Sequence, residues 1–323
     1  MSDLQPDPDE IVCGDDAAVG DLQVLAPRDV PLGGPRAMTV RRTLPSRERT
    51  LIGAWCFVDH YGPDAVADTG GMVVAPHPHT GLQTVSWLFT GEVEHRDSTG
   101  VTATVRPGEV NLMTAGHGIS HSENSTPGTT VLHGVQLWVA LPEAARDVAP
   151  GFAHHVPEPV HGEGWALRVF LGALAGASSP VATHTPLLGA ELLLDAGAEA
   201  AFDLDPSFEH GVLVDHGDVR VDDAPLAAHE LGHLPPGRRR VRLAAGAEGT
   251  RLVLLGGPPF GESIVMWWNF VGRTHEEIVA FREAWQTQVA GGRAADGRFG
   301  VVAGEQERIP APELPHARLR SRG

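Results

Sequence analysis

The chain contains no lysine, and all 24 of its Lys and Arg residues are arginines. Without lysine, neither Schiff-base catalysis nor a phosphate-binding loop of the Walker type is available. Only two cysteines occur in 323 residues, Cys13 and Cys56, which are too few for a disulfide framework or a cysteine-based zinc site. No uncharged apolar run is long enough to span a bilayer. We therefore expect a cytoplasmic protein with no membrane partner.

Positive charge is scarce, because 24 Lys and Arg residues against 41 Asp and Glu residues give a net charge of −17. Such an acidic surface repels phosphate backbones, so we expect no direct binding of nucleic acid. With 42% hydrophobic and 20% charged residues, the composition is typical of a globular protein. Histidine is abundant, with 17 residues, several of them between His60 and His133. This region is where we expect the chemistry.

Glycine (39 residues) and proline (26 residues) separate many short β-rich runs, which predicts an all-β sandwich or barrel fold. A Pro-, Gly- and His-rich stretch after residue 150 divides the chain into two halves of similar length. We predict an acidic N-terminal tail (1–20), a metal-binding β domain (21–150), a second β domain that includes a terminal helix (151–290) and a C-terminal tail (291–323).

The helix is predicted from a single late segment. Thr274 and Glu277 have the spacing of a capping box at a helix N-terminus. The apolar residues that follow recur with helical periodicity, at Ile278, Phe281 and Trp285. We therefore expect one helix packed on a β body.

Two pairs of side chains predict a metal site. His77 and His79 stand at positions i and i+2, and so do His121 and Glu123. Alternate residues of a strand point to the same face, so two such pairs on neighbouring strands would bring four ligands to one point. Three imidazoles and a carboxylate suit one divalent transition metal, and Fe(II), Ni(II), Mn(II), Cu(II) and Zn(II) all remain open. The second half has no His-x-His or His-x-Glu pair on a strand-like run, and we expect it to bind no metal.

The context of these pairs resembles a known family. Gly71-x5-His77-x-His79-x3-Gln83 is similar to the first motif of the cupins, and Gly118-x2-His121 to the core of the second. Further segments resemble the pirin family of two-domain cupins: 76–88 (Pro-His-Pro-His-Thr-Gly-Leu-Gln-Thr-Val-Ser-Trp-Leu), 111–123 (Asn-Leu-Met-Thr-Ala-Gly-His-Gly-Ile-Ser-His-Ser-Glu), 57–63 (Phe-Val-Asp-His-Tyr-Gly-Pro) and 257–261 (Gly-Pro-Pro-Phe-Gly).

The resemblance implies an all-β fold of two tandem cupin (jelly-roll) barrels with a C-terminal helix. It also implies that one divalent metal, most often iron and so Fe(II) here, is held by residues that match the family's ligands: His77, His79, His121 and Glu123. Many pirins have Arg-Gly-Phe-Glu where this chain has Thr-Gly-Leu-Gln at 80–83. The Gly-Leu-Gln version is similar to a second branch of the family.

Other residues have alternative interpretations. Gln83 either orients a ligand beside the metal or satisfies the barrel interior. His117 either lines the pocket or stabilises a tight turn at 116–118. We expect Phe57 and Trp138 to be core residues, as large aromatic residues in strands usually are. Cys56 is expected to be a small buried hydrophobe rather than a nucleophile.

Two functions follow. The resemblance of some pirins to quercetin 2,3-dioxygenases implies an enzyme that cleaves a flavonol or a related enol, a small aromatic substrate, with O2. Glu123 would then both bind the metal and accept the hydroxyl proton. The alternative is a non-catalytic regulatory protein, metal-dependent or redox-sensing, whose partner is a transcription factor or a metabolic enzyme.

Overall fold

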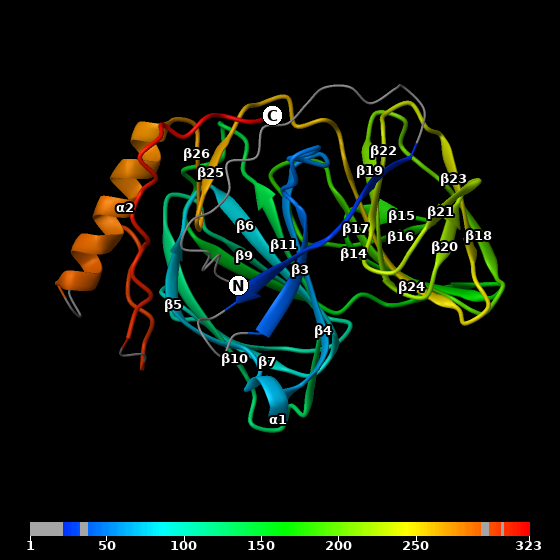
Figure 1. Ribbon diagram of the computed structural model, residues 1–323, viewed down its shortest axis with the longest axis horizontal. Coiled ribbons are helices and arrows are strands. Elements are labelled where there is room, and N and C mark those ends of the chain that lie inside the picture. The colour runs from blue at the N-terminus through cyan, green and yellow to red at the C-terminus, as the bar shows by residue number, and fades with distance from the viewer. Residues whose placement is uncertain (1–21, 33–37, 292–296, 305–306) are drawn as a thin grey trace.

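The computed structural model describes residues 22–32, 38–291, 297–304 and 307–323, so the predicted tail 1–20 lies outside it. Two β-rich halves lie side by side, and one long helix stands at the outer edge of the first half (Figure 1). Within these residues, no helix combines the length and the apolar character that crossing a membrane would require. The all-β prediction with a late helix is confirmed.

The first half consists of two antiparallel sheets, with strand orders β12-β9-β6-β11-β4-β3-β2 and β5-β10-β7-β8. Val40 and Leu88 of the larger sheet pack against Val74 and Val105 of the smaller one. The elements are β2 (Arg28–Leu32), β3 (Met38–Leu44), β4 (Trp55–Ala65), α1 (Val66–Thr69), β5 (Val73–His79), β6 (Leu82–Thr90), β7 (Val93–Asp97), β8 (Thr102–Val105), β9 (Val110–Thr114), β10 (Ile119–Ser125), β11 (Val131–Ala140) and β12 (Gly151–His155).

The second half repeats this arrangement, with sheets β1-β22-β19-β24-β17-β14-β13 and β18-β23-β20-β21. In β23, Val241 and Leu243 point into the core while Arg240 and Arg242 are exposed, the alternation that a half-buried strand requires. The elements are β1 (Gln23–Leu25), β13 (Val160–Gly162), β14 (Trp165–Leu171), β15 (Ala173–Leu174), β16 (Ala177–Ser178), β17 (Leu188–Leu194), β18 (Glu199–Asp203), β19 (Glu209–His216), β20 (Val219–Val221), β21 (Ala224–Leu226), β22 (Leu231–Leu234), β23 (Arg240–Ala245) and β24 (Thr250–Gly257).

The two larger sheets bury each other at the junction of the halves. Val85 and Trp87 of β6 belong to the same core cluster as Phe170 of β14 and Val253 of β24. Residues 82–88 of β6 are therefore buried on both faces, because one face lines the first barrel and the other contacts the second half.

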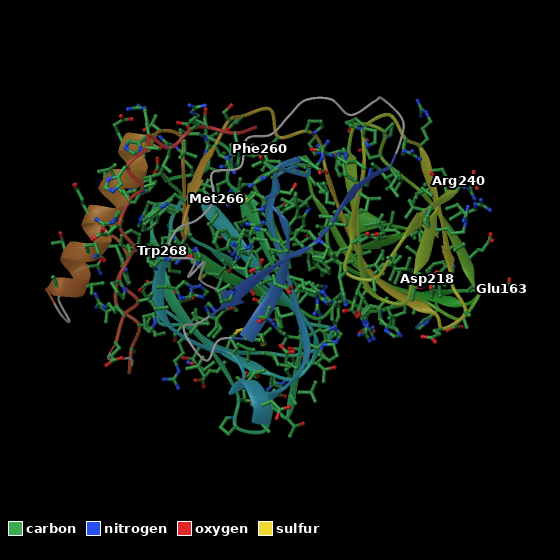
Figure 2. The ribbon with its side chains drawn as sticks, in the orientation of Figure 1. Glu163, Asp218, Arg240, Phe260, Met266 and Trp268 are labelled. Carbon is green, nitrogen blue, oxygen red and sulfur yellow. The ribbon has the colours of Figure 1, made fainter. Side chains whose placement is uncertain are left out.

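The first described strand and the last elements each pack on the half that is remote from them in sequence. β1 pairs with β22 of the second half. Conversely, β25 (Val265–Trp267), β26 (Phe270–Gly272) and α2 (His275–Ala290) lie against the first half, where Phe270 bridges to Thr80. Figure 2 shows Met266 and Trp268 on that side and Arg240 at the opposite end. The predicted second domain, 151–290, includes these late elements, whereas in the structure they pack on the first half.

Helix α2 begins as predicted, because Thr274 caps it by accepting a hydrogen bond from the Glu277 amide at 3.2 Å. Its buried residues include Ile278, Phe281 and Trp285. The described parts of 291–323 differ from the expected tail: Phe299 packs edge-on against Trp285, and the Ile309 amide donates to the Pro76 carbonyl at 2.9 Å. This segment lacks strand or helix periodicity, which is why its packing was not predicted.

Candidate metal centre

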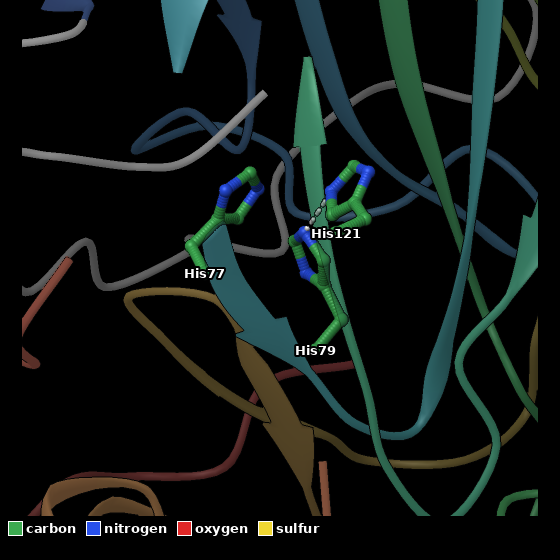
Figure 3. A group of neighbouring side chains, drawn as sticks. All are labelled: His77, His79 and His121. Atoms are coloured by element: carbon green, nitrogen blue, oxygen red, sulfur yellow. Dashed lines mark hydrogen bonds between the residues drawn. The ribbon is translucent and has the colours of Figure 1, made fainter. Parts of the chain in front are cut away.

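Strands β5 and β10 bring the two predicted pairs together. They are antiparallel neighbours, and His121 lies directly opposite His77. The pairing shifts register between His121 and Glu123, and a bulge of this kind re-aims side chains locally. His77, His79 and His121 are fully buried and each offers a ring nitrogen within 4.8 Å of the others. Figure 3 shows the three rings gathered between the two strands.

The backbone fixes the orientation of two of these rings. His77 Nδ1 donates to the Ala75 carbonyl at 2.9 Å, and His79 Nδ1 donates to the Asn269 carbonyl at 3.1 Å. Each neutral ring therefore keeps a lone pair on Nε2. His77 Nε2 is buried and has no hydrogen-bond partner among the described residues. Such an orphaned lone pair is what a metal ligand presents, with its second nitrogen held by a carbonyl.

Burial keeps the three imidazoles neutral. It lowers the pKa of His77 to about 3 and the pKa values of His79 and His121 well below the usual range for histidine. Metal ligation by histidine requires the neutral ring. A cluster of buried, unprotonated imidazoles therefore suits a divalent cation.

Glu123 belongs to a second group of potential ligands, with His95 and His121 rather than with His77 and His79. It is buried, and one of its oxygens lies within 4.8 Å of a ring nitrogen of His121 and of His95. Its Oε1 is 3.5 Å from the Ser86 hydroxyl, which donates a hydrogen bond to Gln136 Oε1 at 2.9 Å. The donor set on β5 and β10 thus contains three imidazoles and an adjacent carboxylate, which fits a divalent transition metal.

A polar row crosses the larger sheet next to Glu123. Ser86 of β6 is opposite Gln136 of β11 on one side and Asn111 of β9 on the other, so these side chains share a face. Gln136 Nε2 and Asn111 Nδ2 are buried and have no hydrogen-bond partner among the described residues. Two unsatisfied donors beside a carboxylate are costly unless a ligand or water accepts from them.

The remaining sequence candidates lie elsewhere. Gln83 and Ser86 are three residues apart on β6, so their side chains point to opposite faces of the sheet. The Gln83 amide donates to Thr114 Oγ1 at 2.9 Å. His117 is exposed in the turn between β9 and β10, and its carbonyl accepts from Arg298 at 2.6 Å.

The aromatic and thiol predictions are confirmed. Phe57 and Trp138 are fully buried and stacked with their ring centroids 4.0 Å apart. Cys56 is also buried, and desolvation raises the pKa of its thiol to about 12.

Three residues that contact the cluster were missed from the sequence. His95 and Asp97 lie on β7, where Asp97 is opposite His121 and His95 is opposite Glu123. They form a third i, i+2 pair on a strand-like run, and that signal was available. Asn269 acts through its carbonyl from 190 positions beyond His79, and no side-chain pattern marks such a contact.

A second cluster of the same residue types lies at the junction of the halves. His60 and His133 come from the first half and Asp215 from the second. Both Nε2 atoms contact Asp215 Oδ1, at 2.6 Å for His60 and 2.5 Å for His133. His133 and Asp215 also line a pocket of about 630 Å³.

The protons of this second cluster are arranged differently. His60 Nδ1 accepts a hydrogen bond from Arg41 at 3.3 Å, so the hydrogen of the neutral ring lies on Nε2 and is donated to Asp215. Burial opposes ionisation of Asp215, but hydrogen bonds from His133 and His60 outweigh it and hold the pKa of Asp215 below its usual range. The geometry is that of a hydrogen-bonded junction between the halves rather than of a metal site.

Comparisons with known proteins match both halves of the chain. Residues 37–139 match the Pirin family model and residues 189–291 match the Pirin C-terminal cupin domain. A Pseudomonas aeruginosa protein described as "Putative quercetin 2,3-dioxygenase" is 45% identical over 296 residues, which cover 91% of each chain. A "Pirin-like protein" of Caulobacter vibrioides is 35% identical, covering 76% of this chain and 88% of its own.

Among solved structures, quercetin 2,3-dioxygenase from Acinetobacter baumannii aligns with a TM-score of 0.85 at 37% identity. The alignment covers 93% of this chain and 97% of that one. The two barrels and the late helix are therefore the two-cupin architecture that the sequence motifs resemble. The chain belongs to the pirin family.

Proposed function

We propose that the chain is a metal-dependent dioxygenase of the quercetin 2,3-dioxygenase type, which cleaves a flavonol or a related enol with O2. The observation that carries this proposal is the buried cluster of three neutral imidazoles on β5 and β10 with the Glu123 carboxylate beside it. The names of the relatives at 45% and 37% identity support the same activity.

In this proposal His77, His79, His121 and Glu123 hold one Fe(II) ion, although Ni(II), Mn(II), Cu(II) and Zn(II) suit the same donors. The bound ion supplies Lewis acidity toward an enol oxygen and redox activity toward O2. The chain's contribution is to keep the three rings unprotonated by burial and to orient two of them through the carbonyls of Ala75 and Asn269.

Glu123 is the proposed base. Its carboxylate accepts the proton of the flavonol hydroxyl, which converts the substrate into the anion that reacts. Ser86 lies between Glu123 Oε1 and the Gln136 side chain. The unsatisfied Gln136 Nε2 and Asn111 Nδ2 atoms are donors for substrate oxygens on this side of the centre.

The test is oxygen consumption with quercetin, measured for the unmodified protein and for Glu123→Gln, each reconstituted with Fe(II), Ni(II) or Mn(II) at matched occupancy. The amide oxygen can still bind a metal but cannot accept the proton. We expect Glu123→Gln to retain metal and to lose about 10²–10⁴-fold in turnover.

Glu94→Gln on β7 is the matched control, because it makes the same chemical change at a partly exposed side chain, and it should leave turnover unchanged. Equal turnover by Glu123→Gln would refute the base role. An absence of turnover by the unmodified protein with every metal would refute the enzyme and favour the regulatory alternative.

A further inference from the structure

A chain of side-chain contacts leads away from His121, on the side opposite to His79. His121 Nδ1 is 3.3 Å from His95 Nδ1, and His95 Nε2 is 3.1 Å from Asp97 Oδ2. All three side chains are buried. The two other rings of the cluster are held by backbone carbonyls, so His121 alone depends on side chains for its orientation.

The direction of these hydrogen bonds is set at Asp97. Its Oδ1 accepts from the Thr99 amide at 2.8 Å, the Thr99 hydroxyl at 2.6 Å and the Val101 amide at 3.3 Å. These three donors occupy Oδ1, which leaves Oδ2 as the oxygen that accepts from His95 Nε2.

The tautomers of both histidines follow from this. His95 Nε2 must carry a hydrogen in order to donate to Asp97, and its Nδ1 faces His121 Nδ1. In the proposed metal centre His121 Nδ1 donates to a lone pair on His95 Nδ1, which leaves His121 Nε2 without a hydrogen. This is the nitrogen that faces His79 Nε2, at 3.1 Å.

We propose that His95 and Asp97 are positioning residues that select the tautomer of His121 which can bind a metal. The proposal rests on the proposed metal centre and adds a specific role for two residues of β7. It also distinguishes His95 from a ligand, although His95, His121 and Glu123 form a potential donor group of their own. When His95 accepts from His121 at Nδ1 and donates to Asp97 at Nε2, it has no nitrogen left for a metal.

Asp97→Asn is the decisive variant. Asn has nearly the same shape as Asp, but one of its two terminal groups is an NH2 donor instead of an oxygen acceptor. The three donors from Thr99 and Val101 require the amide oxygen, so the amide NH2 must face His95. His95 Nε2 then becomes an acceptor, its Nδ1 carries the hydrogen, and His121 is forced to place its own hydrogen on Nε2. The nitrogen needed for the metal is thereby blocked.

Two measurements test this. In metal-free protein labelled with nitrogen-15 histidine, NMR should show His121 as the Nδ1–H tautomer in the unmodified chain and as the Nε2–H tautomer in Asp97→Asn. Competition against a chelator should show Ni(II) affinity about 10- to 100-fold weaker in Asp97→Asn, the usual effect of losing such a partner.

The controls separate this role from general damage to the strand. Glu94→Gln makes the same chemical change on β7 and should alter neither measurement. His95→Gln offers an amide oxygen to His121 Nδ1 and should retain more affinity than His95→Leu, which offers none. An unchanged His121 tautomer in Asp97→Asn, or Ni(II) affinity equal to that of Glu94→Gln, would overturn the proposal.

The outcome also distinguishes this proposal from the proposed function. Failure of the unmodified chain to bind any metal would refute the metal centre and the positioning role together. Tight Ni(II) binding combined with an unaltered Asp97→Asn variant would refute the positioning role alone. A tautomer switch with weaker Ni(II) binding, but without flavonol turnover in the unmodified chain, would support the positioning role and refute the enzyme.

Discussion

His79 and His121 face each other through Nε2 atoms 3.1 Å apart, and each ring has a second partner at Nδ1, the Asn269 carbonyl for His79 and His95 for His121. In the proposed metal-binding tautomers both Nε2 atoms carry lone pairs, which repel each other at this distance. Burial prevents relief by protonation, because it lowers the pKa values of both rings. A cation bound between the rings in the proposed centre would remove this repulsion.

The first prediction concerns metal content. The purified chain should carry about one divalent metal, and His77→Ala should abolish it, because a polar cavity with one ligand missing binds metal weakly. His117→Ala is the matched control, since His117 is exposed in a turn, and it should keep the metal. Elemental analysis of the three proteins decides the matter. Full occupancy in His77→Ala would contradict the ligand assignment.

The second prediction concerns Asp215. Its pKa is lowered in the folded protein, so its contribution to stability is present above the pKa of the unfolded chain, about 3.9, and is lost as the pH falls below that value. Asp215→Asn should lower the free energy of unfolding by about 1.5–3 kcal/mol at neutral pH, because it replaces a buried carboxylate that accepts hydrogen bonds from His60 and His133. The difference from the unmodified protein should shrink in acid. Denaturant titrations at several pH values measure both effects.

The same variant tests whether the junction holds a metal. Asp215→Asn should leave metal content at its original value, because the hydrogens on the Nε2 atoms of His60 and His133 point at Asp215. Asp195→Asn is the control for stability, since Asp195 lines the same pocket but is exposed. A metal content that fell with Asp215→Asn would show that the junction is a ligand site.

The third prediction concerns the packing of the C-terminal segment. Trp285 is fully buried in α2, and its indole nitrogen donates to the Ile309 carbonyl at 2.8 Å. Trp285→Ala should therefore cost about 3–5 kcal/mol of unfolding free energy. Glu283→Ala changes an exposed residue of the same helix and should cost less than about 0.5 kcal/mol. Equal losses in Trp285→Ala and Glu283→Ala would mean that the packing of the C-terminal segment contributes little to stability.

The sequence alone predicted the fold class, the late helix and the convergence of His77, His79 and His121. These features depend on local periodicity and on the alternation of strand residues, which a single sequence displays. The roles of His95 and Asp97 depend on the register between β7 and β10, which only the folded structure defines. The contact from the Asn269 carbonyl depends on the path of the chain, and it has no local signature.

Because elements from each half pack on the other, a gene segment that encodes one half does not encode a complete site. Residues 21–150 contain all four proposed ligands, yet the carbonyl that orients His79 and the helix that covers β25 and β26 are encoded more than a hundred codons later. A gene fragment for the first half would specify the ligands without the conditions that make them bind. We therefore expect the two halves to evolve together, although each has a barrel of its own.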